Sequence, residues 1–419
     1  MKSWNRPGVP ALPGASSAPR IWDTASAQLV TTKPSTASGA STASGGSIAG
    51  IYVCGITPYD ATHIGHAATY LAYDTLIRLW LDAGFDVRYV QNTTDVDDPL
   101  LERATATGVD WQDLAAQQTD LFRADMEALA ILPPDHYVAV TEMIEPTAEV
   151  VKALLDRDIA YYVEDDIYFD SDSAATQSPW TIGDESNYDR ATMLALSAER
   201  GGDPQRVGKR DPLDPLLWRN GRAGEPSWQT VLGRGRPGWH IECSVIAETY
   251  LDLPITVQAG GSDLIFPHHE FSAGHAAAAT GSQLARVYSH AGLVAYQGEK
   301  MSKSLGNLVF VSKLTAAGVD PRAIRLAILA QHYRRDWEWT DALLDEAQAR
   351  LERWLGWAEH ANDRVVRETA LLAEVRALLG DDLNSAGAMA AIDASVAAGV
   401  GATVVDLDAI DALLGVRLH

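Results

Sequence analysis

The sequence predicts an α/β protein in which a Rossmann-like parallel sheet carries an α/β insertion and is followed by a bundle of helices. Residues 51–66, IYVCGITPYDATHIGH, begin with a short apolar strand, pass through a polar turn and lead into a periodic apolar helix over 70–81. Two further strand patterns, 86–91 and 255–258, end in polar or glycine-rich turns. Beyond residue 309, apolar residues recur at helical spacing over 321–331, 341–357, 371–379 and 386–414.

Composition indicates an acidic globular protein. A chain of 419 residues is too long for one core and predicts two or three domains, and 47% hydrophobic residues can fill them. The formal charge of −23 repels polyanions, which counts against a long nucleic-acid footprint. The first twenty residues show no signal peptide, and no apolar run reaches the roughly 18 residues of a membrane span. We therefore expect a cytoplasmic protein that binds no membrane.

The loop after the first strand is suited to binding a phosphate. It lies at the carboxyl end of a strand and opens a helix, where backbone N–H groups and the helix dipole attract anions. His63 and His66 can donate hydrogen bonds to phosphate, and Gly65 lets a nucleotide lie close to the backbone. A capped turn explains the same residues equally well, so this interpretation depends on a second motif.

That second motif is Lys-Met-Ser-Lys-Ser at 300–304, which follows a strand pattern over 289–295. HIGH followed at this distance by KMSKS resembles the paired signature of class I aminoacyl-tRNA synthetases. The segments 89–98, 233–244 and 260–270 resemble the cysteinyl branch of that class. Details such as GITP at 55–58, HAAT at 66–69 and ERGGDP at 199–204 are more similar to its short relatives, the mycothiol-pathway ligases that join cysteine to glucosaminyl-inositol.

The resemblance implies a reaction in two halves. ATP, with Mg²⁺, would activate L-cysteine as cysteinyl-AMP on a class I synthetase catalytic domain, and the cysteinyl group would then pass to the amine of 1-O-glucosaminyl-inositol. His63 and His66 would stabilise the attacked phosphate, and Lys300 and Lys303 the departing pyrophosphate. The residues implied to hold the adenylate are Cys54, Gly55, Ile56, Thr57, Thr69, Asn92, Thr93, Thr94, Trp239, Gly261, Ser262, Asp263 and Val294.

Cys54, Cys243 and His268 are the candidate metal ligands. Two thiolates and an imidazole make a tetrahedral zinc set with one open position, which the thiol of a cysteine substrate would fill. The position that matches the synthetases' fourth ligand, a glutamate, is Ser272, which is too short and too weak to replace it. We expect one Zn²⁺ per chain, with His269 and Glu270 orienting its ligand. Taken as residue types alone, the three also fit buried cysteines and a capping histidine.

The expected domains are a 1–50 extension, a catalytic domain in two halves (51–110 and 234–310), a connective insertion (111–233) and a 311–419 bundle. Within the extension, the Ser/Thr/Ala/Gly tract at 31–50 predicts a flexible loop. Because the chain stops after the bundle, without the module that synthetases usually use for the anticodon, we expect that it binds no tRNA. We also expect a monomer. Two other functions remain as alternatives to the glucosaminyl-inositol ligase: a cysteine–tRNA ligase, and an inactive synthetase-like regulator or binding module.

Overall fold

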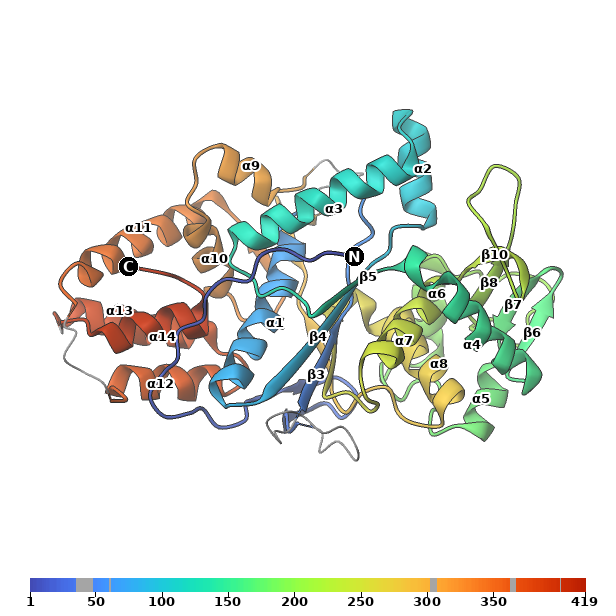
Figure 1. The fold of residues 1–419 in the computed structure, drawn as a ribbon, viewed down its shortest axis with the longest axis horizontal. Helices are drawn as coiled ribbons and strands as arrows, with labels where there is room; N and C mark the ends of the chain where they lie inside the picture. The colour runs from blue at the N-terminus through green and yellow to red at the C-terminus, as the bar shows by residue number, and fades with distance from the viewer. Residues whose placement is uncertain (35–47, 60–61, 302–306, 362–366, 400) are drawn as a thin grey trace.

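The structure is a computed structural model that describes residues 1–34, 48–59, 62–301, 307–361, 367–399 and 401–419. Within these residues lies a parallel sheet of five strands in the order β12-β11-β3-β4-β5. Figure 1 shows this sheet between a helical bundle on one side and the insertion on the other, which confirms the predicted α/β fold. The strands are β3 (Ile48–Val53), β4 (Asp86–Thr93), β5 (His136–Ala139), β11 (Val257–Gly261) and β12 (Tyr288–Ala291).

The strand, loop and helix predicted around residue 51 are present. All six residues of β3 are buried, as a central parallel strand requires. Helix α1 (Ile64–Asp82) begins at His63, whose side chain accepts a hydrogen bond from the Gly65 N–H and so caps the helix. Helices α2 (Asp98–Thr107) and α3 (Trp111–Ala128) follow β4.

The insertion is built on an antiparallel sheet in the order β6-β7-β8-β10-β9. The predicted hairpin is confirmed as β6 (Ala160–Val163) and β7 (Asp166–Phe169). The elements do not follow the expected boundaries at 111 and 233, because β5 pairs with β4 in the parallel sheet and β10 (Gly233–Pro237) pairs with β8. The remaining elements here are η1 (Val140–Met143), α4 (Ile144–Asp156), α5 (Ser171–Gln177), α6 (Arg190–Glu199), β8 (Leu216–Asn220) and β9 (Trp228–Thr230).

The single strand predicted over 289–295 is wrong, because the chain leaves the parallel sheet at Gly292. The Gly292 N–H donates to the Tyr333 carbonyl and the Leu293 N–H to Asp336, which turns the chain outward. It continues as β13 (Val294–Tyr296), between β14 (Glu299–Lys300) and β15 (Trp337–Trp339). The helix pattern over 386–414 likewise divides into α13 (Ser385–Ala397) and α14 (Val404–Leu414), with Gly399 at φ +66° between them.

The other helices lie between the strands of the parallel sheet in sequence or follow them in the bundle. Helix α7 precedes β11, and η2, η3 and α8 connect β11 to β12. In the part of the chain that the structure describes, no helix is long and apolar enough to cross a membrane. The helices not yet given are α7 (Trp239–Tyr250), η2 (Ser262–Leu264), η3 (Ile265–His269), α8 (Glu270–Thr280), α9 (Val311–Ala316), α10 (Pro321–Leu329), α11 (Asp341–Ala358) and α12 (Ala370–Leu379).

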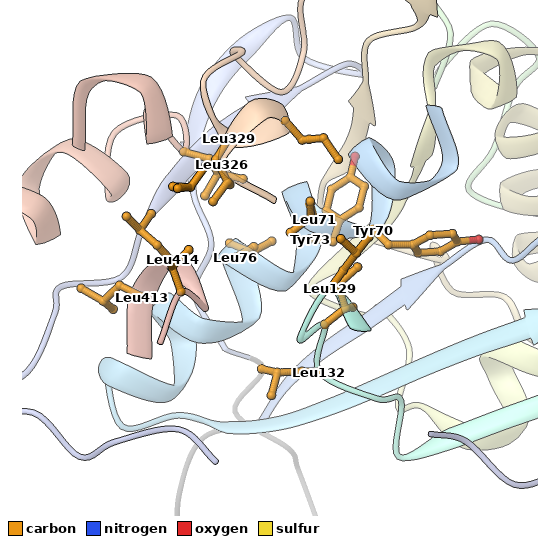
Figure 2. Packing of buried hydrophobic residues seen from close by; sticks show 14 of the residues in the cluster. Tyr70, Leu71, Tyr73, Leu76, Leu129, Leu132, Leu326, Leu329, Leu413 and Leu414 are labelled. Atoms are coloured by element: carbon orange, nitrogen blue, oxygen red, sulfur yellow. The ribbon is translucent and has the colours of Figure 1, made fainter. Parts of the chain in front are cut away.

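The bundle and the catalytic domain share one hydrophobic core. Figure 2 shows Leu71 and Leu76 of α1 among Leu326 and Leu329 of α10 and Leu414 of α14. Each such side chain contributes about 1.5–3 kcal/mol when fully buried. The helix that begins with HIGH is therefore held in place by the bundle.

The N-terminal segment lies against the catalytic domain. Trp4 is buried in the same core and its Nε1 donates to the Ile131 carbonyl at 2.8 Å. A hairpin not expected from the sequence follows, β1 (Arg20–Asp23) and β2 (Gln28–Thr31). Of the tract at 31–50, residues 48–50 belong to β3, while 35–47 lie outside the described residues.

Candidate active site

Residues implied to hold an adenylate meet at the carboxyl edge of the parallel sheet. A Cβ on Gly261, the last residue of β11, would lie 3.9 Å from Thr69 Oγ1 on α1. A Cβ on Gly65 would lie 4.0 Å from the Cβ of Val294, which follows β12. The first turns of α1 therefore face both Gly261 and Val294. Ser262 and Asp263 continue from Gly261 in η2.

Asn92, Thr93 and Thr94 are buried and support the loop that follows β3. Asn92 Oδ1 accepts from the Gly55 N–H at 2.8 Å, and the Thr94 N–H donates to the Ile56 carbonyl at 2.9 Å. A Cβ on Gly55 would lie 1.7 Å from the Asn92 carbonyl oxygen, so only glycine fits there. This packing fixes the loop containing Cys54 and half-buried Thr57.

Cys54, Cys243 and His268 form a buried group that can hold a metal ion. Their ligand atoms all lie within 4.8 Å of one another. The two Sγ atoms are 4.0 Å apart, and His268 Nε2 lies 3.1 Å from Cys243 Sγ. On a tetrahedral zinc, two sulfurs lie roughly 3.8 Å apart and a sulfur and a nitrogen roughly 3.6 Å. The donor types therefore fit zinc; the two sulfurs are close to the tetrahedral spacing, and His268 Nε2 is nearer to Cys243 Sγ than on a bound ion.

The neighbours of His268 fix its ring with Nε2 toward Cys243. His268 Nδ1 lies 3.1 Å from His240 Nδ1, and the half-buried Trp239 indole stacks on the imidazole with centroids 4.5 Å apart. A partner on the second ring nitrogen is the usual support of a metal-binding histidine. His240 was not expected from the sequence, although its position three residues before Cys243, about one helical turn away, is a signal for it.

A chain of polar contacts runs from Cys54 to the N-terminal hairpin. Cys54 Sγ lies 3.2 Å from His269 Nε2, and His269 Nδ1 lies 2.7 Å from His290 Nε2. His290 Nδ1 in turn lies 2.7 Å from Thr24 Oγ1. His269 therefore contacts a candidate ligand directly, while Thr24 and His290 were not expected from the sequence.

Glu270 does not orient the metal ligand as expected. Its carboxylate accepts hydrogen bonds from Trp180 Nε1, the Gly183 N–H and the Ser186 N–H, all in the insertion. Its place in α8, two positions beyond His268, turns it toward residues 180–186 of the insertion. Ser272 Oγ donates to the His240 carbonyl at 3.1 Å, so it supports the site without entering the ligand set.

Burial and neighbouring groups shift the pKa values of the two thiols in opposite directions. Burial, followed by the hydrogen bond with Cys243, holds the pKa of Cys54 well above its usual value. Burial alone would also raise the pKa of Cys243, but the Cys54 hydrogen bond and the adjacent His268 imidazole hold it well below the usual value. Cys243 is thus poised as the thiolate that a metal requires.

The start of the HIGH motif contacts residues 309 and 310, which follow KMSKS in the sequence. The Ile64 N–H donates to the Val309 carbonyl at 2.9 Å, and His63 forms a β-bridge with Phe310. The backbone of Lys300, in β14, pairs with that of Ala295, in β13. Lys303 lies outside the described residues.

The two histidines of HIGH stack with centroids 3.8 Å apart. Burial lowers the pKa of His66 to about 4, and its Nδ1 has no hydrogen-bond partner in the described part of the chain. His66 is therefore neutral at pH 7 and can still donate one hydrogen bond.

Comparisons with known proteins point to one family. Residues 41–349 match the family of class I tRNA synthetases (C), catalytic domain. A protein from Clavibacter michiganensis subsp. michiganensis named L-cysteine:1D-myo-inositol 2-amino-2-deoxy-alpha-D-glucopyranoside ligase is 62% identical over 430 residues, covering 100% of this chain and 99% of its own. A protein of the same name from Thermobispora bispora is 56% identical and covers 100% of both chains.

Comparison with solved structures shows a similarity of fold only. The Mycobacterium tuberculosis methionyl-tRNA synthetase in complex with methionyl-adenylate superimposes with a TM-score of 0.57 at 18% identity, covering 88% of this chain and 82% of that one. The leucyl-tRNA synthetase of Agrobacterium radiobacter K84 gives a TM-score of 0.57 at 12% identity, covering 87% and 82%.

Proposed function

Since the chain belongs to the family of L-cysteine:1D-myo-inositol 2-amino-2-deoxy-alpha-D-glucopyranoside ligases, which is built on a class I synthetase catalytic domain, we propose that it catalyses that ligation in mycothiol biosynthesis. The observation that carries the proposal is the buried Cys54, Cys243 and His268 group at the edge of the sheet where the HIGH helix begins. A thiol-selective site beside a nucleotide-binding edge suits an enzyme that activates cysteine with ATP.

In the first half-reaction the cysteine carboxylate attacks the α-phosphate of ATP, and pyrophosphate leaves with its Mg²⁺. We assign His63 and His66 to the attacked phosphate and Lys300 and Lys303 to the pyrophosphate. Support comes from the position of the two histidines at the N-terminus of α1, where the helix dipole also favours an anion. Positioning and charge stabilisation are most of what a protein can contribute to this step.

We assign one Zn²⁺ per chain to Cys54 Sγ, Cys243 Sγ and His268 Nε2. The bound ion would supply selectivity, since it prefers a soft thiolate to the hydroxyl of serine and promotes loss of the thiol proton. The chain contributes a dry, shaped site: the three ligands are buried, and Trp239 covers one face of His268.

In the second half-reaction the amine of 1-O-glucosaminyl-myo-inositol attacks the carbonyl carbon of cysteinyl-AMP. The new C–N bond replaces the C–O bond to AMP, the amine loses a proton, and AMP is released. We assign the adenylate to Gly261, Ser262, Asp263, Thr69 and Val294, supported by the proximity of Gly261 to Thr69 and of Gly65 to Val294.

The test is formation of AMP and of the amide product by purified protein supplied with ATP, Mg²⁺, L-cysteine and glucosaminyl-inositol. Product should depend on both cysteine and the aminosugar, and serine should replace cysteine poorly. Pyrophosphate exchange with cysteine but no amide product would restrict the function to adenylate formation. No cysteine-dependent exchange would contradict the proposal altogether.

A further inference from the structure

The Glu199–Pro204 turn contacts the active-site segment that contains a metal ligand. Helix α6 ends at Glu199, and Gly201, at φ +83°, turns the chain away from the helix. This places the Arg200 guanidinium against the catalytic domain, where Nη1 donates to the Asp263 and Phe266 carbonyls, both at 2.6 Å. These two hydrogen bonds run from the insertion to the carboxyl edge of the sheet.

The segment that Arg200 contacts joins the two parts of the site. Gly261 to Asp263 are among the residues assigned to the adenylate, and His268 is one of the three candidate metal ligands. Between them, Phe266 has extended backbone angles, φ −139° and ψ 136°, inside an otherwise helical stretch. A carbonyl at such a kink lacks a regular helical partner, and the guanidinium supplies one.

The rest of the turn anchors Arg200 in the insertion. Asp203 accepts from Lys209 Nζ at 2.9 Å and from the Tyr168 hydroxyl on β7. A Cβ on Gly202 would lie 2.2 Å from Ser197 Oγ, so the second glycine is needed for close packing on α6. Arg200 thus extends from a support that is fixed to the insertion sheet.

We propose that Arg200 is a positioning residue through which the Glu199–Pro204 turn sets the shape of the Gly261–His269 segment for adenylate formation. The proposal rests on the proposed function. Loss of the guanidinium frees the Asp263 and Phe266 carbonyls, so the segment relaxes between Gly261 and His268. Nucleotide binding and metal binding are therefore expected to weaken together, because Asp263 and His268 belong to the same segment.

The experiment compares Arg200→Ala and Arg200→Lys with Arg190→Ala. Arg190 is the first residue of α6, and its half-exposed guanidinium pairs with Asp211 of the insertion. In cysteine-dependent ATP–pyrophosphate exchange, Arg200→Ala should raise KM for both ATP and cysteine by about tenfold, the effect of about 1.4 kcal/mol. It should also change the visible spectrum of the Co²⁺-substituted protein. Arg200→Lys, which keeps the charge but not the planar fork, should recover part of both effects.

The outcomes separate the inference from the function. Exchange absent in the wild type contradicts the proposed function. An active wild type whose Arg200→Ala and Arg200→Lys variants keep wild-type KM values and Co²⁺ spectrum contradicts the positioning role, even if their melting temperatures fall. If Arg200→Ala does not fold, Arg200→Lys alone decides, because wild-type KM values and spectrum in that variant contradict the role.

Discussion

Cys54 directly follows β3 and contacts both the candidate metal ligand Cys243 and the histidine His269. Its Sγ is 4.0 Å from Cys243 Sγ and 3.2 Å from His269 Nε2, and Gln258 Nε2 approaches at 3.5 Å. A buried thiol with this many polar neighbours is better explained by a metal than by packing alone.

We predict that purified protein carries about one zinc per chain and that Cys54→Ala loses it together with cysteine activation. Ser272→Ala is the matched control, because Ser272 is also buried beside the site and its hydroxyl donates to the His240 carbonyl. Metal analysis and ATP–pyrophosphate exchange give both readouts. Full zinc content in Cys54→Ala would show that the ligand set is wrong.

Lys303 tests whether KMSKS acts on the pyrophosphate. Lys303→Ala should slow cysteine-dependent exchange by on the order of a hundredfold, since its charge is needed where negative charge develops. Cysteine binding should change little. Exchange kinetics and calorimetric binding of cysteine separate the two effects, and a rate loss below about threefold would rule out the assigned role.

Asp125 carries a buried carboxyl next to the residue that precedes HIGH. Burial raises its pKa to about 7, and the neighbouring Thr62 hydroxyl opposes part of that shift. A folded pKa above the unfolded value means that the native state holds the proton more tightly, so stability falls as pH rises from about 4 to about 7.

Replacing this carboxyl by a neutral amide should remove that pH dependence. Asp125→Asn should gain stability relative to the wild type at pH 7.5 but not at pH 4, by at most about 4 kcal/mol. Urea unfolding at both pH values measures the difference. Equal wild-type and variant curves at both values would show that Asp125 is ionised in the folded protein.

At the scale of elements, α1 is fixed by buried charges as well as by leucines. Asp74 accepts from Arg78 Nε at 2.8 Å and from the Arg325 guanidinium on α10. Arg325 also donates to the Leu129 and Leu414 carbonyls, which ties α1 and α10 to the end of α14. Breaking such a buried network leaves polar groups without partners.

Arg325→Met should therefore lower the free energy of unfolding by about 3–5 kcal/mol. Arg353→Met is the control: Arg353 pairs with Glu346 on the surface, where the loss should stay below about 1 kcal/mol. Chemical denaturation measures both. Equal losses would mean that the network adds nothing beyond a surface pair.

Much of the fold was predictable because local patterns and tertiary contacts agree. The strand before Cys54, the helix after His63 and the hairpin at 160–169 each have regular periodicity and clear turn residues. The break at Gly292 and the position of β5 in the parallel sheet depend on partners more than 40 residues away, which a local pattern does not contain.

The site was predictable where residue chemistry is distinctive. Two cysteines and a histidine pointed to a metal, and the structure brings them within 4.8 Å. His240 and Arg200 were missed as contributors because their importance lies in what they contact: one faces a ring nitrogen and the other two backbone carbonyls.

At the scale of the whole molecule, charge bears on the choice of acceptor. A formal charge of −23 gives a field that repels nucleic acid, whereas a small neutral or cationic aminosugar is not repelled. A tRNA needs phosphate contacts over a wide surface, and every such contact makes binding weaker as salt rises.

We therefore predict that the apparent KM for glucosaminyl-inositol changes less than about twofold between 50 and 200 mM salt, and that tRNA is not cysteinylated under the same conditions. For comparison, a protein with 6–10 phosphate contacts loses roughly 10³–10⁵ in affinity over that range. Parallel assays with each acceptor, at equal adenylate supply, measure both rates. Because both acceptors would use the same cysteinyl-AMP, charging of tRNA at a rate comparable to amide formation would favour the synthetase function. A steep loss of aminosugar ligation with salt would instead indicate that ionic contacts dominate acceptor binding.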